Sequence, residues 1–115
     1  MEILYKNEAV KQQFCSEYKK KWRYPEQVKK KLMAAENYIK SFNSFWDIAM
    51  YQPFKLERLQ GNRKAEWSIR LGNTGYRVTM IPCDDNENEL IGGDIMAESR
   101  SIKIVEVTEV SNHYE

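Results

Sequence analysis

EWSIRLGNTGYR, residues 66–77, has the pattern of two β-strands joined by a tight turn. The central GNTG, residues 72–75, supplies glycine and asparagine, which tolerate the positive φ angles of short hairpin turns. Before the turn, Trp67, Ile69 and Leu71 alternate with polar residues, and a second alternating run follows it. This periodicity predicts an antiparallel hairpin with one apolar face.

Two arginines are expected to face each other in this hairpin. Pairing Gly72 with Gly75 places Arg70 opposite Arg77, on the face away from Trp67. Directly opposed like charges destabilise a sheet, so such a pair favours a bound anion, and guanidinium groups suit phosphate. The alternative is that both side chains extend into solvent or pair with carboxylates of the protein itself.

Length and composition indicate one domain with its own hydrophobic core. The chain has 115 residues, of which 42% are hydrophobic and 30% charged. No run approaches 18 apolar residues and the first residues lack a signal-peptide pattern, so we expect a cytoplasmic protein without membrane contact. Cys15 and Cys83 have no metal-ligand spacing and are predicted to be reduced, packed thiols. Neither a metal nor another cofactor is indicated.

The net charge of +1 conceals a strong asymmetry along the chain. Residues 1–54 carry ten Lys and Arg against six Asp and Glu, and residues 55–78 carry six against two, so each segment has a net charge of +4. Residues 79–115 carry two against nine, a net charge of −7. The basic segments predict a polyanionic partner. The acidic segment either shields the basic face or only solvates the chain.

Hydrophobic periodicity predicts two helices, over residues 8–22 and 25–43, that form an antiparallel helical hairpin. Asn7 is a plausible N-cap of the first helix, and Pro25 suits the start of the second. The predicted fold class is α+β, with the helical hairpin packed on a mostly antiparallel twisted sheet. Its strands are expected at residues 2–6, 65–71, 76–82 and 102–110.

Three further segments have less regular patterns. Residues 44–59 are predicted to be a helix end followed by a packed connection, and residues 82–100 an exposed loop or a frayed hairpin. Cations cluster at the end of the first predicted helix and on the second. They either complement the helix dipole and solvate the surface, or they bind RNA. They are Lys19, Lys20, Lys21, Arg23 and Lys29 to Lys31.

The order of one strand, two helices and three strands, with an arginine hairpin and a terminal His-Tyr, resembles the RelE/ParE toxin superfamily, and more closely its HigB branch. The likeness lies in residues 56–71 (LERLQGNRKAEWSIRL), residues 75–78 (GYRV) and residues 107–114. It implies a RelE-like fold and a toxin of a type II toxin–antitoxin system. Such toxins cleave mRNA in the ribosomal A site without a metal and are neutralised by a helix-turn-helix, HigA-like antitoxin.

Residue roles follow from the same resemblance. Arg70 and Arg77 would hold the scissile phosphate, Lys64 with Arg63 would add positive charge, and His113 with Tyr114 would form a C-terminal catalytic pair. Apart from the resemblance, the net charge of +4 in the first segment predicts RNA or ribosome contacts at Lys19, Lys20, Lys21 and Arg23, and Arg63 and Asn73 are predicted contacts as well.

Proton transfer needs two groups, and the sequence contains a single histidine. His113 is the natural acid or base, and Lys64 or Tyr114 is the second candidate. Tyr114 is also suited to stacking on a base. Many relatives end in an Asp-Tyr-His order instead of Asn112-His113-Tyr114, which leaves the roles at the tail open. Two other functions use the same fold: a ParE-like inhibitor of DNA gyrase and a non-catalytic RNA-binding module.

Overall fold

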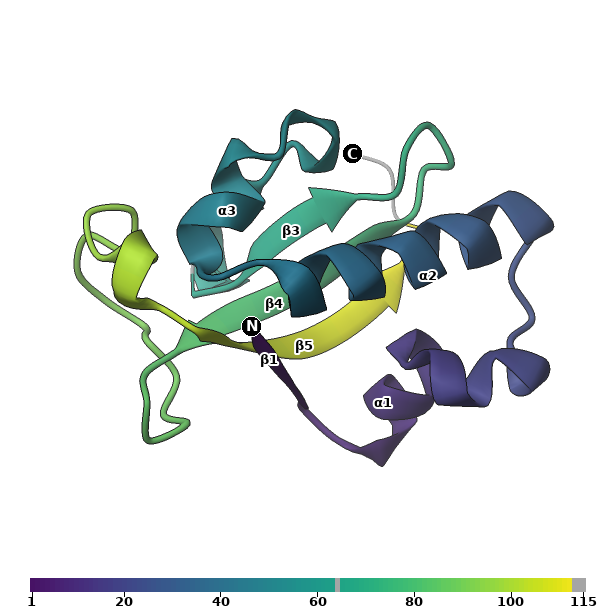
Figure 1. Ribbon diagram of the computed structural model, residues 1–115, viewed down its shortest axis with the longest axis horizontal. Helices are drawn as coiled ribbons and strands as arrows, with labels where there is room; N and C mark the ends of the chain where they lie inside the picture. Colours follow the sequence, from purple (N-terminus) through teal and green to yellow (C-terminus); the bar gives the residue numbers. More distant parts are fainter. Residues whose placement is uncertain (64, 113–115) are drawn as a thin grey trace.

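A five-stranded sheet in the order β1-β5-β4-β3-β2 is the frame of the molecule. The computed structural model describes residues 1–63 and 65–112 (Figure 1). β1 runs parallel to β5, and the other neighbouring strands are antiparallel. The sheet is therefore mixed but mostly antiparallel. Its strands are β1 (Glu2–Tyr5), β2 (Glu57–Arg58), β3 (Trp67–Arg70), β4 (Arg77–Cys83) and β5 (Ile104–Ser111).

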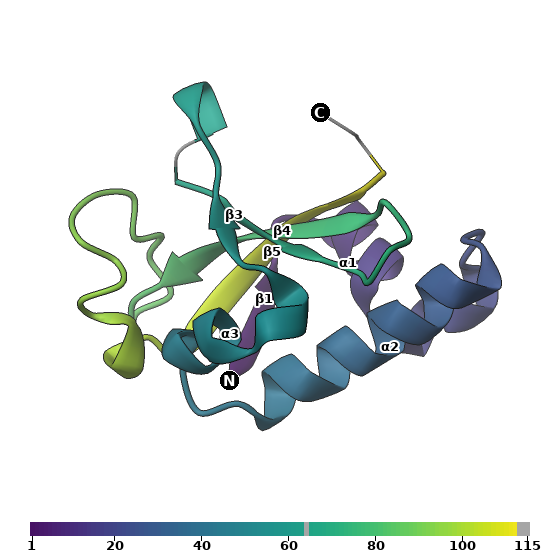
Figure 2. The same cartoon turned by 90° about the horizontal axis from the view of Figure 1, so that it is seen from above.

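The helices α1 (Glu8–Phe14), α2 (Glu26–Ser41) and α3 (Phe45–Met50) pack on this sheet. Figure 2 shows α2 and α3 on one side of it, and no α-helix of the described residues covers the opposite face. The core lies between the helices and the sheet, where burial of apolar surface supplies most of the stabilisation. Its fully buried members include Phe14, Leu32, Ile39, Phe45, Ile48, Ile69, Val78, Met80, Val105 and Val107.

The α+β class and the four predicted strands are confirmed, and every strand end lies within two residues of its predicted position. β5 lies between β1 and β4, as expected for an internal strand with apolar residues on both faces. Cys15 and Cys83 are buried free thiols, as predicted. Among the described residues, no helix is long and apolar enough to cross a membrane.

The prediction of one continuous helix over residues 8–22 is wrong. α1 begins as expected, with the Asn7 side chain accepting a hydrogen bond from Val10 N at 2.9 Å. It ends at Phe14, because Cys15 has an extended backbone (φ −73°, ψ 128°) and a 3₁₀ helix follows over Ser16–Lys21. In place of the first predicted helix, the chain forms α1 and then this 3₁₀ helix, whereas the second predicted helix is the continuous α2.

The break lets aromatic side chains complete the end of α1. Trp22 Nε1 donates to the Gln12 carbonyl at 2.9 Å, and the Tyr24 hydroxyl donates to the Gln13 carbonyl at 3.0 Å. Both carbonyls lie in the last turn of α1, where no intrahelical donor is available. Trp22 is nevertheless buried, as its place in the predicted apolar stripe requires.

Residues 44–59 hold more regular structure than predicted. Ser44 and Asp47 form a capping box at the start of α3, and Glu57 and Arg58 form the short edge strand β2. The Ser44-x-x-Asp47 spacing was a readable signal for this helix. Residues 82–100 are mostly exposed, as predicted, but Ile95 is buried in the core and anchors the segment.

Candidate functional site

The β3–β4 hairpin has the predicted register, with Arg70 paired opposite Arg77. Leu71 N donates to the Tyr76 carbonyl at 3.0 Å, which makes the neighbouring 70–77 pair the closer, non-hydrogen-bonded kind. Their Cβ atoms are then roughly 5 Å apart. Gly72 and Gly75 adopt φ angles of +60° and +84°, which glycine alone takes without strain.

The two arginines have different electrostatic surroundings. Arg77 Nη1 lies 3.7 Å from Glu57 Oε1, a long ion pair with a carboxylate that is 60% exposed. Arg70 is exposed, and no carboxylate of the described residues forms an ion pair with it. Among the described residues, the pair thus has this one long ion pair, on the face of the sheet that no α-helix covers (Figure 2).

Arg63 is held differently, in an ion-pair network beside the hairpin. Its guanidinium binds both Glu66 oxygens, at 2.8 and 2.9 Å, and Glu109 Oε1 at 2.8 Å. Thr108 Oγ1 also donates to Glu66, at 2.8 Å. The network joins the segment before β3 to Thr108 and Glu109 of β5. It therefore stabilises the part of the sheet next to the β3–β4 hairpin.

The pKa shifts agree with this arrangement. Hydrogen bonds to Glu66 and Glu109 raise the pKa of Arg63, while the hydrogen bond from Arg63 lowers the pKa of Glu66 despite partial burial. The carboxylates of Glu66 and Glu109 thus balance the charge of Arg63. This balance favours a bracing role for Arg63 over the predicted contact with RNA. Sequence reasoning missed this network, although the i,i+3 spacing of Arg63 and Glu66 was visible.

The predicted basic cluster lies at the hairpin end of the molecule. Lys19, Lys20, Lys21 and Arg23 are all exposed. Tyr24 connects this segment to the hairpin through an edge-on contact with Tyr76, with ring centroids 5.6 Å apart. A shallow groove of about 500 Å³ runs between them, and its lining residues include Lys21, Arg23, Tyr24 and Tyr76.

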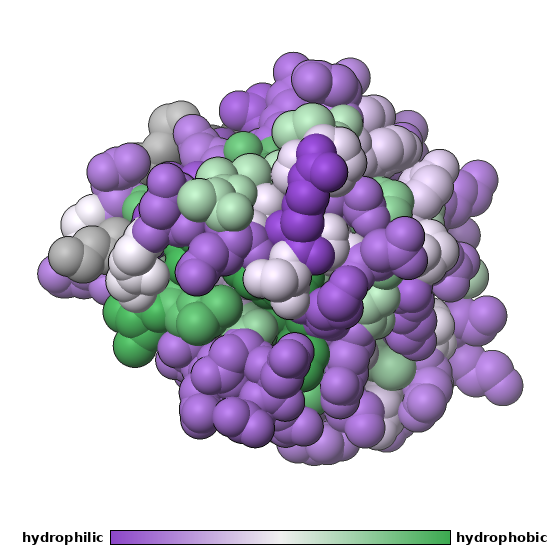
Figure 3. Space-filling view, turned by 60° about the vertical axis from the view of Figure 1, so that its left-hand side comes forward, coloured by the Kyte–Doolittle hydropathy of each residue, from purple (hydrophilic) through white to green (hydrophobic). Residues whose placement is uncertain are grey.

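Many of the acidic residues of the C-terminal part of the sequence lie away from the hairpin. Figures 1 and 2 both place the segment from residue 84 to residue 101 at the end of the molecule opposite the 72–75 turn. This segment carries six carboxylates and one arginine. Figure 3, which brings that end forward, shows a mainly hydrophilic surface. Residues 84–101 therefore do not cover the hairpin (Figures 1 and 2), whereas Glu109, farther along the same acidic part of the sequence, pairs with Arg63 beside it.

Four predicted site residues remain: Lys64, Asn73, His113 and Tyr114. Lys64, His113 and Tyr114 lie outside the described residues. Lys64 follows Arg63, and His113 comes two positions after Ser111, which pairs with Arg77. Asn73 is exposed in the hairpin turn.

Within residues 1–63 and 65–112, no group of three or more His, Cys, Asp and Glu side chains is arranged to hold a metal ion. No protein family, curated protein or solved structure matches this chain.

Proposed function

We propose that this protein is the toxin of a type II toxin–antitoxin system: a RelE-like, HigB-like endoribonuclease that cleaves mRNA on the ribosome and thereby inhibits translation. The observation that carries the proposal is the pair of Arg70 and Arg77, opposed on the sheet face that no α-helix covers, where the long contact between Arg77 and Glu57 is their one ion pair within the described residues. Opposed cations without compensating carboxylates are costly to the fold, and a phosphodiester between them removes the repulsion.

The reaction begins when the ribose 2′-hydroxyl attacks the adjacent phosphorus. A bond forms from O2′ to phosphorus, and the bond from phosphorus to O5′ breaks, leaving a 2′,3′-cyclic phosphate and a 5′-hydroxyl. One group removes the proton of the 2′-hydroxyl, and another protonates the departing O5′. Arg70 and Arg77 stabilise the negative charge that develops on the non-bridging oxygens, which is where preorganised donors are worth most.

The two proton transfers are proposed for Lys64, His113 and Tyr114, which lie outside the described residues. His113 is the first candidate because an imidazole titrates near neutral pH. Lys64 or Tyr114 supplies the second group, and Tyr114 is alternatively a stacking platform for a base. A cytoplasmic location and a HigA-like antitoxin partner belong to the same proposal.

Induced expression followed by primer extension on a reporter mRNA tests this function. We expect discrete cleavage sites within codons when translating ribosomes are present and none on the naked transcript. Intact mRNA together with arrested DNA replication would identify a gyrase inhibitor instead. Intact mRNA with retained RNA binding would identify a non-catalytic module.

The basic cluster gives a separate prediction. Replacing Lys19, Lys20 and Lys21 with glutamine is expected to weaken ribosome binding and to reduce the slope of log K against log salt by roughly two to three, about one unit per lost phosphate contact. Binding is measured by co-sedimentation with ribosomes at several salt concentrations.

A matched control replaces three exposed lysines outside the cluster with the same change in net charge. Lys40, Lys55 and Lys103 are suitable because each is exposed. If both triple variants lose the same affinity and slope, the effect is one of net charge, and Lys19 to Lys21 only complement their helix end.

A further inference from the structure

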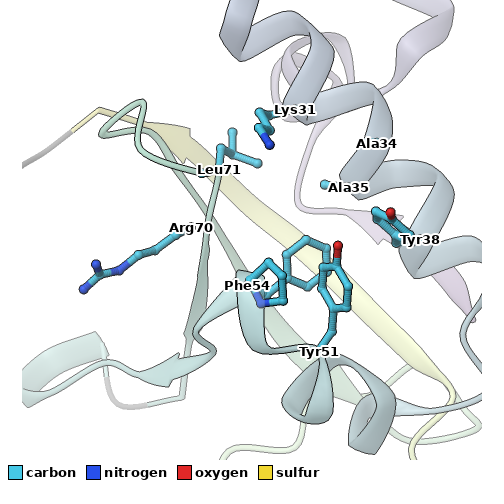
Figure 4. Close-up of a pocket in the computed structure, with 10 residues that line it drawn as sticks. Lys31, Ala34, Ala35, Tyr38, Tyr51, Phe54, Arg70 and Leu71 are labelled. Atoms are coloured by element: carbon cyan, nitrogen blue, oxygen red, sulfur yellow. The ribbon is translucent and has the colours of Figure 1, made fainter.

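A small pocket lies between α2, the segment after α3 and the end of β3. It has a volume of about 150 Å³, below the roughly 300–1,000 Å³ typical of sites for drug-sized ligands. A space of this size suits one planar ring system. Figure 4 shows its lining residues, which are Lys31, Ala34, Ala35, Tyr38, Tyr51, Pro53, Phe54, Arg70, Leu71 and Gly72.

The spacing of α2 residues explains why the pocket exists. Lys31, Ala34, Ala35 and Tyr38 follow i, i+3, i+4, i+7 spacing and therefore share one helix face. The two alanines leave open the volume that larger side chains would fill. On the opposite wall, Gly72 brings the hairpin so close that a Cβ there would lie 3.0 Å from Lys31 Cε.

Aromatic rings form the other wall of the pocket. The Tyr38 and Tyr51 ring centroids are 4.9 Å apart, and those of Tyr51 and Phe54 are 4.8 Å apart. Tyr38 remains 42% exposed although it belongs to this cluster. An exposed, rigidly packed ring beside a cavity is a surface on which another flat ring can stack.

The charges around the pocket are positive. Figure 4 shows the Lys31 ammonium directed from α2 toward the pocket, whereas the Arg70 guanidinium points away from it. None of the described residues that line the pocket is acidic. Its ligand is therefore expected to combine a planar ring with an anionic group.

The position of the pocket relates it to the arginine pair. β2 pairs only with Trp67 and Ser68, so β2 leaves the edge of β3 beyond Ser68 uncovered. Arg70 lines the pocket, but its guanidinium points away from it (Figure 4). The side chain extends to the sheet face on which Arg70 is paired with Arg77. A flexible strand crossing this edge can contact both places.

We propose that this pocket binds one base of a single-stranded RNA, in the nucleotide next to the phosphate that Arg70 and Arg77 hold. The base lies against the wall formed by Tyr38 and Tyr51, and Lys31 contacts a phosphate of the same strand. The inference rests on the proposed function for the identity of the strand. An apolar side chain of a partner protein would fill the space equally well, but it would leave the Lys31 ammonium without an anion.

A cavity-filling variant tests the inference without breaking the aromatic cluster. The probe is a trinucleotide with 2′-O-methyl riboses, which cannot be cleaved, together with the same trinucleotide lacking its middle base. Amide chemical shifts report binding even at millimolar affinity. For the native chain we expect the shifts to centre on Lys31, Tyr38 and Gly72, and the affinity to fall about tenfold without the base, the usual worth of one stacked base.

Ala34→Leu should remove this tenfold preference, so that both trinucleotides bind with the same weak affinity. Asn37→Leu is the matched control, because it places the same side chain on an exposed position of α2 that does not line the pocket. Likewise, Lys31→Gln should weaken binding, while Lys103→Gln, which removes an exposed cation outside the pocket and before the first residue of β5, should not.

Absence of shifts at the pocket, or an unchanged base preference in Ala34→Leu, would overturn the inference. The proposed function is judged separately, by mRNA cleavage in Arg70 and Arg77 variants. If those variants lose cleavage and the trinucleotide does not bind at the pocket, the base-binding inference is wrong and the proposed function stands. If those variants retain cleavage, Arg70 and Arg77 do not hold the scissile phosphate, whether or not the pocket binds a base.

Discussion

Arg77→Ala is expected to reduce the rate of mRNA cleavage by about 100- to 1,000-fold and to abolish growth arrest, and Arg70→Ala should do the same. This is the usual cost of removing one preorganised donor from a developing oxyanion. Arg→Lys at either position should be poorly tolerated, because an ammonium cannot supply two parallel hydrogen bonds to a phosphate. Single-turnover cleavage on programmed ribosomes is the measurement.

The same substitutions should leave the melting temperature unchanged or slightly higher. Among the described residues, Arg77 forms one ion pair, a long contact with Glu57, whose side chain is 60% exposed, and surface pairs contribute at most about 1 kcal/mol. Removing either arginine also relieves the repulsion between them. Loss of activity without loss of stability is the signature of a group retained for its ligand.

Two control variants sharpen the result. Glu57→Gln removes the carboxylate nearest Arg77, so RNA affinity should rise slightly at low salt, opposite in sign to Arg77→Ala. Lys103→Ala removes an exposed cation before the first residue of β5, at the strand end remote from the hairpin, and should change neither binding nor cleavage. A fully toxic Arg77→Ala variant, or one that melts many degrees lower, would show that the arginine is structural.

The hairpin could be predicted from sequence because its determinants are local. Gly72, Gly75 and the alternation on either side fix both the turn and the register, so Arg70 and Arg77 face each other whatever the rest of the chain does. The same holds for β5, whose apolar residues on both faces indicate an internal strand.

Other features depend on contacts between distant residues. Arg63 was expected to bind RNA, but Glu109, 46 positions later, balances part of its charge. The pocket is formed by α2, residues 51–54 and the hairpin, and no sequence pattern brings these three together. The helix break at Cys15 has a similar origin, because the next amide, Ser16 N, donates a hydrogen bond to Glu36 on α2.

Glu36→Ala is expected to lower the free energy of unfolding by about 3 kcal/mol, through a lost hydrogen bond and a cavity. Glu36 is only 1% exposed, and its Oε1 accepts a hydrogen bond from Ser16 N at 3.2 Å. That amide is the first beyond the extended residue Cys15, so Glu36 stabilises the point where α1 stops. Denaturant unfolding of both proteins measures the difference.

Two further variants separate the contribution of the Ser16 hydrogen bond from that of the ion pair with Lys40. Glu36→Gln keeps an acceptor for Ser16 and should cost only about 1 kcal/mol. Lys40 Nζ lies 3.1 Å from Glu36 Oε2, but the lysine side chain is 55% exposed, so Lys40→Ala should cost less than about 1 kcal/mol. If Lys40→Ala were as damaging as Glu36→Ala, the ion pair and not the backbone hydrogen bond would hold the segment.

The pH dependence provides a last test of the same carboxylate. Burial alone would raise the pKa of Glu36, but hydrogen bonds from Ser16 and Lys40 outweigh it and hold the pKa below its ordinary value. A lowered pKa in the folded state stabilises the protein above the unfolded value of about 4.3, and this contribution is lost as pH falls through the folded pKa. The stability gap between the native chain and Glu36→Gln should therefore be constant from pH 8 to about pH 5 and shrink below about pH 4. A gap that widens in acid would mean that Glu36 is buried as a neutral acid, with its pKa raised instead of lowered.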